Sequence, residues 1–202
     1  ANVEKTIFLG PDPLQLPDVR PGLEDLRLSS LSPAKSTLRT RLPVSFAGKQ
    51  HWFLLEDLEE GRRYEVRICW AATQPTSFWL DTHTITTVLE TPDLVSALAS
   101  YSESIAESVL VTERSQTAEA SSSLFLQIRA AADFYTTNKT LMNSPPDVKV
   151  DVILDPFILN VLPRSLAPTG VYIVVVAVVA WFLSGVIARF ISSVGQSKPH
   201  ND

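Results

Sequence analysis

The stretch HWFLLEDLEEGRRYEVRICWAA, residues 51–72, decides the fold of this chain. Its first half is a largely apolar run that ends at Leu58, and a turn follows at Glu59-Glu60-Gly61. Apolar and polar side chains then alternate from Tyr64 to Trp70. A period of two residues is typical of a β-strand with one buried face. The stretch therefore predicts two strands joined by a tight corner, in a mainly β fold.

Three residues of this stretch are spaced as in fibronectin type III and immunoglobulin-like sandwiches. In those domains a leucine and a turn glycine precede a strand that opens with tyrosine, and the tyrosine hydroxyl caps the corner. Leu58, Gly61 and Tyr64 hold these places here. The resemblance implies a β-sandwich, and it implies no particular function.

Six further segments have the β-branched, aromatic or alternating character of strands. Pro43 interrupts one of them, which indicates an edge strand or a bulge, and Asp155-Pro156 is expected to end the last one. Residues 112–123 and 136–146 are predicted loops. For the short apolar run at 157–162 we keep three interpretations: a strand, a segment on the bilayer surface, or a segment on a partner. The six segments are residues 3–9, 23–31, 37–46, 78–88, 124–130 and 148–154.

One amphipathic helix is predicted from Pro92 to about Val111. Thr91 supplies an N-cap hydroxyl, Pro92 stands at the first helical position and Asp93 adds an acid to the first turn. Apolar side chains then recur at helical spacing. We expect this helix to pack on the sandwich, with docking to a partner as the alternative. The apolar positions are Leu94, Leu98, Tyr101, Ile105 and Val109.

The stretch VYIVVVAVVAWFLSGVIA, residues 171–188, is predicted to cross a lipid bilayer. No charged residue occurs between Arg164 and Arg189. About twenty helical residues rising about 1.5 Å each span a hydrocarbon core of about 30 Å, and a helix satisfies its own backbone there. The predicted parts are a lumenal sandwich domain (residues 1–163), a linker (164–170), a transmembrane helix (171–191) and a cytosolic tail (192–202).

Small side chains recur every four residues along one side of this helix. They are Ala180, Ser184 and Ala188, with Ala177 beside them. Small residues let another helix approach closely, whereas the Val- and Ile-rich sides suit lipid. Tyr172 fits the aromatic belt at a membrane interface. The small residues therefore predict a packing face for a partner helix.

Three features together predict a single-pass type I orientation, with the domain lumenal or extracellular. The sequence begins Ala1-Asn2-Val3 without methionine, as after removal of a signal peptide; a trimmed sequence is the alternative. Asn138-Lys139-Thr140 is an N-glycosylation sequon, which predicts a glycan on Asn138. Arg189 and Lys198 follow the helix while Arg164 precedes it, which slightly favours a cytosolic C-terminus.

The composition excludes several classes of protein. The net charge of −5 comes from interspersed acidic and basic residues, so no basic face for nucleic acid is expected. Cys69 is the one cysteine, so an internal disulfide is impossible. We expect Cys69 to be a small buried side chain in a strand.

The sequence predicts no catalytic residue, no metal site and no cofactor. Nucleophilic catalysis needs a nucleophile beside a base and an orienting acid, and the sequence does not bring such a set together. Asp81 and His83 share one face of a strand and offer two metal ligands, but a third is not evident. Asp151 and Asp155 are expected to be solvated.

Phe78 and Trp79 are candidates for a lumenal interface. As neighbours on a strand they point to opposite faces, so one of them is expected to be exposed. An exposed aromatic side chain is a suitable anchor for a partner. Trp52, Trp70 and Trp79 all fall in strands and are expected to fill the core.

At the level of family, the chain resembles the fungal co-activator subunits of GPI mannosyltransferase II. The resemblance lies in NVEKTIFLGP (2–11), in GRRYEVRICWAATQPTSFWLDT (61–82) and in the layout of one domain followed by one helix. It implies a protein of the endoplasmic reticulum membrane that is not itself the transferase. It also implies a multi-pass partner that adds the second mannose to the GPI precursor from dolichyl-phosphate mannose. The regulatory subunit of the first GPI mannosyltransferase shares this layout.

The resulting hypothesis is a non-catalytic accessory subunit. Its helix packs against the catalytic subunit, and its domain lies over that subunit's lumenal loops. The alternative is a cell-surface adhesion or receptor-like module, and localisation separates the two. An enzyme is a third possibility, which activity of the isolated chain would support.

Overall fold

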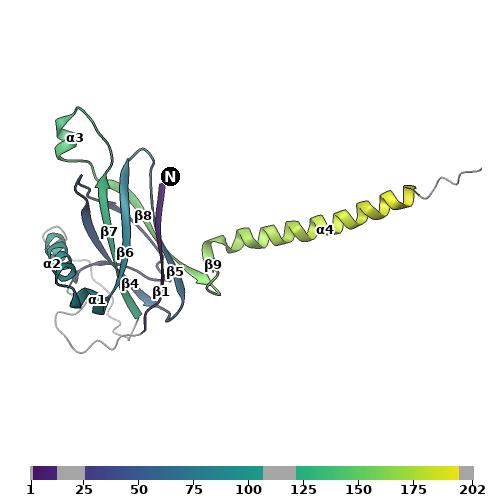
Figure 1. Ribbon diagram of the computed structural model, residues 1–202, viewed down its shortest axis with the longest axis horizontal. Helices are drawn as coiled ribbons and strands as arrows, with labels where there is room; N and C mark the ends of the chain where they lie inside the picture. Colours follow the sequence, from purple (N-terminus) through teal and green to yellow (C-terminus); the bar gives the residue numbers. More distant parts are fainter. Residues whose placement is uncertain (1, 13–25, 107–121, 196–202) are drawn as a thin grey trace, which may run out of the picture.

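Two β-sheets form the body of the protein, and one long helix leaves it (Figure 1). The computed structural model describes residues 2–12, 26–106 and 122–195. The first sheet has the order β1-β5-β8-β3, with β9 paired to β8, and the second has the order β2-β4-β7-β6. The strands are β1 (Asn2–Leu9), β2 (Ser29–Leu31), β3 (Thr37–Leu42), β4 (Lys49–Leu58), β5 (Arg63–Trp70), β6 (Thr76–Thr84), β7 (Ser122–Ala132), β8 (Val148–Ile158) and β9 (Leu162–Pro163).

The main core lies between the two sheets. The alternation predicted for β5 is observed, since Tyr64, Val66 and Ile68 are fully buried. They share one hydrophobic cluster with Leu126 and Ile128 of β7 in the other sheet. Each strand thus turns every second side chain inward. The prediction of a mainly β fold built from two sheets and followed by an apolar helix is confirmed.

The corner at residues 58–64 closes as the spacing predicts. The Tyr64 hydroxyl accepts a hydrogen bond of 2.9 Å from the Glu59 backbone N–H. Gly61 sits in the turn at φ +66°, a left-handed conformation that glycine adopts without strain. Gly10 follows β1 and packs against this corner, donating to the Arg62 carbonyl at 2.8 Å. A β-carbon on Gly10 would lie 2.0 Å from the Glu59 oxygen, so only glycine fits there.

A second, smaller core forms where two helices, α1 (Ile85–Glu90) and α2 (Pro92–Ala106), cover the outer side of the second sheet. Trp52 and Phe125 of the sheet pack there with Val88 and Leu98 of the helices. The predicted strand 78–88 is wrong beyond Thr84, because the Thr84 hydroxyl accepts from the Thr87 N–H and starts α1. The predicted helix begins at Pro92 as expected, and its last five residues, 107–111, lie outside the described residues.

Other boundaries also differ from the sequence prediction. Strand β3 ends at Leu42, directly before Pro43. Strand β8 runs through Asp155-Pro156 to Ile158, so the predicted end was wrong. The Leu154 N–H donates to the Ser36 carbonyl, just before β3 begins. The Pro156 nitrogen points to the same edge of β8, at a position that β3 does not reach. Proline therefore breaks no ladder hydrogen bond at this position.

Two further helical segments were not predicted. A short helix, α3 (Lys139–Asn143), lies in the predicted loop 136–146. A 3-10 turn, η2 (Arg164–Leu166), leads into α4 (Ala167–Gly195), so helical structure begins inside the predicted linker 164–170.

Candidate functional site at the joint between domain and helix

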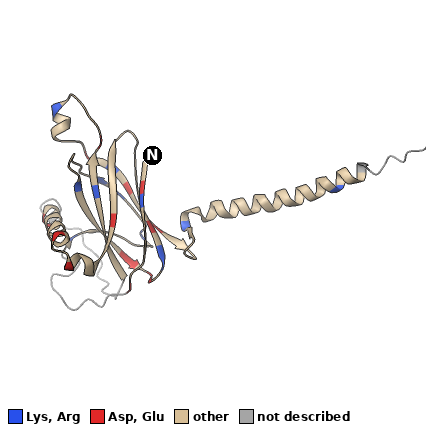
Figure 2. Cartoon of the chain, in the orientation of Figure 1, with Lys and Arg blue, Asp and Glu red and all other residues tan. Residues whose placement is uncertain are grey.

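Helix α4 leaves from the side of the first sheet and points away from the second sheet (Figure 1). Within the described residues it is the one helix that is long and apolar enough to cross a membrane, by length and composition. Its apolar portion is not buried against the domain. Charged residues are spread over the domain, whereas α4 is almost free of them (Figure 2).

The predicted packing face lies along α4, on one side of the helix. Ala177, Ala180, Ser184 and Ala188 are all exposed, so this side is open to a neighbouring helix. At 3.6 residues per turn, Val175, Phe182 and Val186 lie on the opposite side. Partner packing through the small side chains stays a prediction.

A buried ion-pair network fixes the start of the helix to the domain. Both carboxylate oxygens of Asp155 accept the Ser165 backbone N–H at 3.3 Å. The Arg67 guanidinium lies 3.8 Å from Asp155 and from Glu65, and the Lys5 ammonium lies 3.0 Å from Glu65. Both carboxylates are about 95% buried, and buried charges of this kind need such partners.

The expectation that Asp155 is solvated is therefore wrong. Its place in β8 puts it on the outer face of the first sheet, but η2 folds back over that face and covers it. The sequence carries no local signal for this burial, because the covering residues belong to the next structural element. Asp155 is the residue of the joint that sequence reasoning missed.

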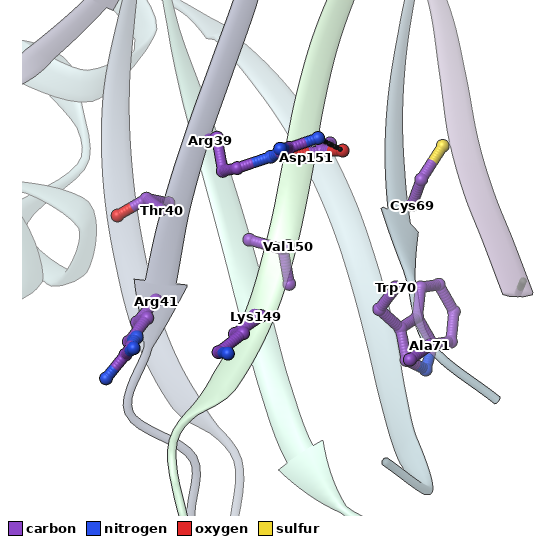
Figure 3. Close-up of a pocket in the computed structure, with 9 residues that line it drawn as sticks. All are labelled: Arg39, Thr40, Arg41, Cys69, Trp70, Ala71, Lys149, Val150 and Asp151. Atoms are coloured by element: carbon purple, nitrogen blue, oxygen red, sulfur yellow. Dashed lines mark hydrogen bonds and ion pairs between the residues drawn. The ribbon is translucent and has the colours of Figure 1, made fainter. Parts of the chain in front are cut away.

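The outer face of the first sheet also holds an open groove of about 640 Å³ (Figure 3). The Arg39 guanidinium donates two hydrogen bonds of 2.7 and 2.9 Å to the Asp151 carboxylate. These bonds lower the pKa of that carboxyl from its usual value. Arg41 and Lys149 lie directly opposite each other on neighbouring strands. Among the described residues neither side chain has an acidic partner, so the pair is suited to an anionic group.

Comparison with known families decides where this architecture belongs. A family model described as the GPI-mannosyltransferase II co-activator (Pga1) matches residues 28–186. The chain belongs to this family. The matched region runs from the residue before β2 into the last third of α4, so it covers the domain from β2 onward and most of the helix, whereas β1 precedes it. No curated protein and no solved structure matches the chain. The fibronectin- or immunoglobulin-like relationship stays a prediction from the corner.

In this member of the co-activator family, the two metal-ligand candidates lie on one strand, as predicted. His83 Nε2 donates to Gln127 at 3.2 Å, and its ring lies 6.1 Å from that of Trp52. Within the described residues, no group of three His, Cys, Asp or Glu side chains, with or without Asp81, lies close enough together to bind a metal ion. Cys69 was expected to be buried, but it is only partly buried, and it is a free thiol.

The adjacent aromatic residues take opposite environments. Phe78 is 5% exposed and packs edge-on against Trp70, with ring centroids 4.6 Å apart, so it belongs to the core. Trp79 is 44% exposed, and the Arg129 guanidinium lies 4.2 Å from its ring centroid. The expectation that Trp79 fills the core is wrong, because Trp79 lies on the outer face of β6, opposite to Phe78. Only Trp79 of the pair is therefore accessible to a partner, and its interface role stays a prediction.

Asn138 lies on the surface at the start of α3, away from α4 (Figure 1). Its side-chain oxygen accepts the Thr140 backbone N–H at 3.0 Å and caps the short helix. This bond does not use the side-chain amide nitrogen, to which the predicted glycan would be attached. The geometry is thus compatible with the predicted glycan, which remains a prediction.

Proposed function

We propose that this chain is a non-catalytic subunit of the endoplasmic reticulum complex that adds the second mannose to the GPI precursor. The observation that carries the proposal is the co-activator family match over residues 28–186, which covers the domain from β2 onward and most of α4. The catalytic chemistry belongs to a multi-pass partner that uses dolichyl-phosphate mannose. The chain crosses the membrane once, with its domain in the lumen and its C-terminus in the cytosol.

In this proposal α4 binds the catalytic subunit through its small side chains. Ala180 and Ser184 lie near the middle of the helix and leave room for a close helix–helix contact. In lipid, association of two helices depends on such packing. The hydrophobic effect does not drive it, because lipid tails are as apolar as the helix surfaces.

The joint then sets the position of the domain above the partner. Asp155 ties the helix entrance to the first sheet, so the domain is held close to the point where the chain enters the bilayer. A tethered domain acts at high effective concentration on the lumenal loops of its partner. This supports stabilisation or shaping of the partner's active site without a catalytic residue of its own.

The experiment compares two double variants in cells that depend on this subunit. Ala180→Leu with Ser184→Leu fills the packing face, whereas Val175→Leu with Val186→Leu enlarges the opposite side. We expect the first pair to lose co-purification with the multi-pass partner and to accumulate GPI precursors with one mannose. The second pair should behave like the wild type. Co-purification that survives the first pair, or surface labelling of the chain in place of retention in the endoplasmic reticulum, would contradict the proposal.

A further inference from the structure

The last residue of β8 and the four residues after it form a largely apolar hairpin, which we call the tip hairpin (Ile158–Leu162). Strand β8 pairs with β9 through Ile158 and Leu162. At the tip Leu159 is 90% exposed and Val161 is 78% exposed. Loops that face only water are normally polar, so this exposure calls for a contact that the isolated domain does not make.

The tip is held in place by its one polar residue. Asn160 accepts from the Arg63 N–H at 2.9 Å and donates to the Gly61 carbonyl at 3.0 Å. Leu159 and Asn160 both have positive φ, at +52° and +57°. Asparagine tolerates this left-handed conformation, but leucine does so poorly. The fold thus presents Leu159 to the outside although the turn would favour a different residue there.

The tip hairpin lies against the beginning of α4. A β-carbon on Gly170 would lie 3.7 Å from the Leu162 side chain, so the hairpin touches the first turn of the helix. Ser165 follows the hairpin and precedes α4, and its backbone N–H donates to the Asp155 carboxylate. Figure 1 shows the hairpin on the side of the first sheet from which α4 leaves. Hairpin and helix entrance are therefore in direct contact.

Basic and acidic side chains both lie near the apolar tip, since Glu60 and Arg62 line a hollow together with Leu159. Arg164 starts η2, and the Arg63 guanidinium lies 5.9 Å from the Phe157 ring centroid. Arg62 donates to the Phe157 carbonyl at 3.3 Å, while its charge is paired with Glu59. Arginines beside exposed apolar side chains suit the boundary between acyl chains and phosphate headgroups.

We infer that the tip hairpin inserts Leu159 and Val161 into the lumenal boundary of the bilayer and so fixes the orientation of the domain. The occupant is phospholipid, because the tip is continuous with a helix that enters lipid within a few residues. The inference rests on the proposed function only in that α4 spans the bilayer. The hairpin acts as a second contact, so that the domain does not swing on a single helix.

The test measures depth in the bilayer with the full-length chain in phosphatidylcholine liposomes. In a Cys69→Ser background, a spin label is placed by Leu159→Cys or Val161→Cys. Reference labels use Val178→Cys inside α4 and Tyr135→Cys, whose native side chain is 86% exposed on the domain. We expect collision with a water-soluble nickel chelate at 159 and 161 to be several-fold lower than at 135. Collision with oxygen should be higher at 159 and 161 than at 135.

A second variant separates insertion from folding. Leu159→Asn suits the left-handed turn better than leucine, so thermal stability should be unchanged or higher. The label at Val161→Cys should nevertheless become several-fold more accessible to nickel, because the apolar contact is lost. Unchanged nickel accessibility in Leu159→Asn would overturn the inference.

The reference labels distinguish the possible failures. If 159 and 161 match the aqueous value while 178 stays protected, the hairpin inference is overturned and the membrane span stands. If 178 is also open to nickel, the span and the proposed function fail together with the hairpin. Protection of 159 and 161 that arises only when the mannosyltransferase partner is present would overturn the bilayer as occupant and assign the tip to that protein.

Discussion

Replacing Tyr64 by phenylalanine tests the corner that organises the domain. The Tyr64 side chain is fully buried, and its hydroxyl accepts the Glu59 N–H at 2.9 Å. Tyr64→Phe keeps the ring, which stacks on Phe8 with centroids 5.7 Å apart, and removes only the acceptor. An intramolecular hydrogen bond contributes about 0.5–1.5 kcal/mol net, and an unsatisfied buried donor costs about 1–3 kcal/mol. We expect the free energy of unfolding to fall by about 1–3 kcal/mol, at the lower end if water reaches the Glu59 N–H.

The measurement is thermal and denaturant unfolding of the full chain in mild detergent, followed by tryptophan fluorescence. For a domain of this size 1 kcal/mol corresponds to about 2–4 °C, so Tyr64→Phe should lower the Tm by about 2–12 °C. Tyr135→Phe is the matched control, because that side chain is 86% exposed, and its effect should stay within about 0.5 kcal/mol. If the two variants are equally stable, the hydroxyl does not hold the corner and the reasoning is refuted.

Three further predictions concern charge, pH and glycosylation. Lys149→Glu places an acid opposite Arg41 on the neighbouring strand and should raise stability by about 0.2–1 kcal/mol in denaturant unfolding, whereas Lys149→Gln should gain less. Burial lowers the pKa of His51 from its usual 6.5, while its hydrogen bond to a backbone carbonyl opposes this; the unfolded chain therefore binds the proton more readily. Stability should be fully present above pH 6.5 and should fall as the pH drops below it, and His51→Gln should flatten that slope; an unchanged slope would contradict the assignment. Thr140→Ala destroys the sequon but keeps the backbone N–H that Asn138 caps, so it should remove an endoglycosidase-sensitive glycan without changing the Tm, and an unaltered gel mobility would show that Asn138 is unmodified.

The alternation of side chains made the strands predictable. In β5 and β7 every second residue is apolar, and these residues point into one core. The period works because a strand exposes its two faces to different surroundings, whatever its neighbours are. It failed for residues 85–88, where β-branched residues follow Thr84. There the capping hydrogen bond from Thr87 and contact with the second core favour a helix over a longer strand.

The candidate site was predictable only in part. The small-residue face of α4 and the sequon at Asn138 are local patterns, so both are visible in the sequence, although their roles remain to be tested. The ion pair of Asp155 with Arg67 and its hydrogen bonds from Ser165 were not visible, because Arg67 is far away in sequence and Ser165 belongs to another element. Of Phe78 and Trp79, only the packing of the sheets decides which one is covered.

The sequence by itself determined the corner at Leu58, Gly61 and Tyr64, the mainly β class and the apolar helix. Each of these depends on short-range spacing or on a long uncharged run, and both are properties of the chain alone. Only the tertiary structure decided that β8 passes through Pro156, that Asp155 is buried at the joint, and that Leu159 projects beside the start of α4. These features depend on where the neighbouring strands end and on which elements cover each face of the sheet. Residues distant in sequence determine both.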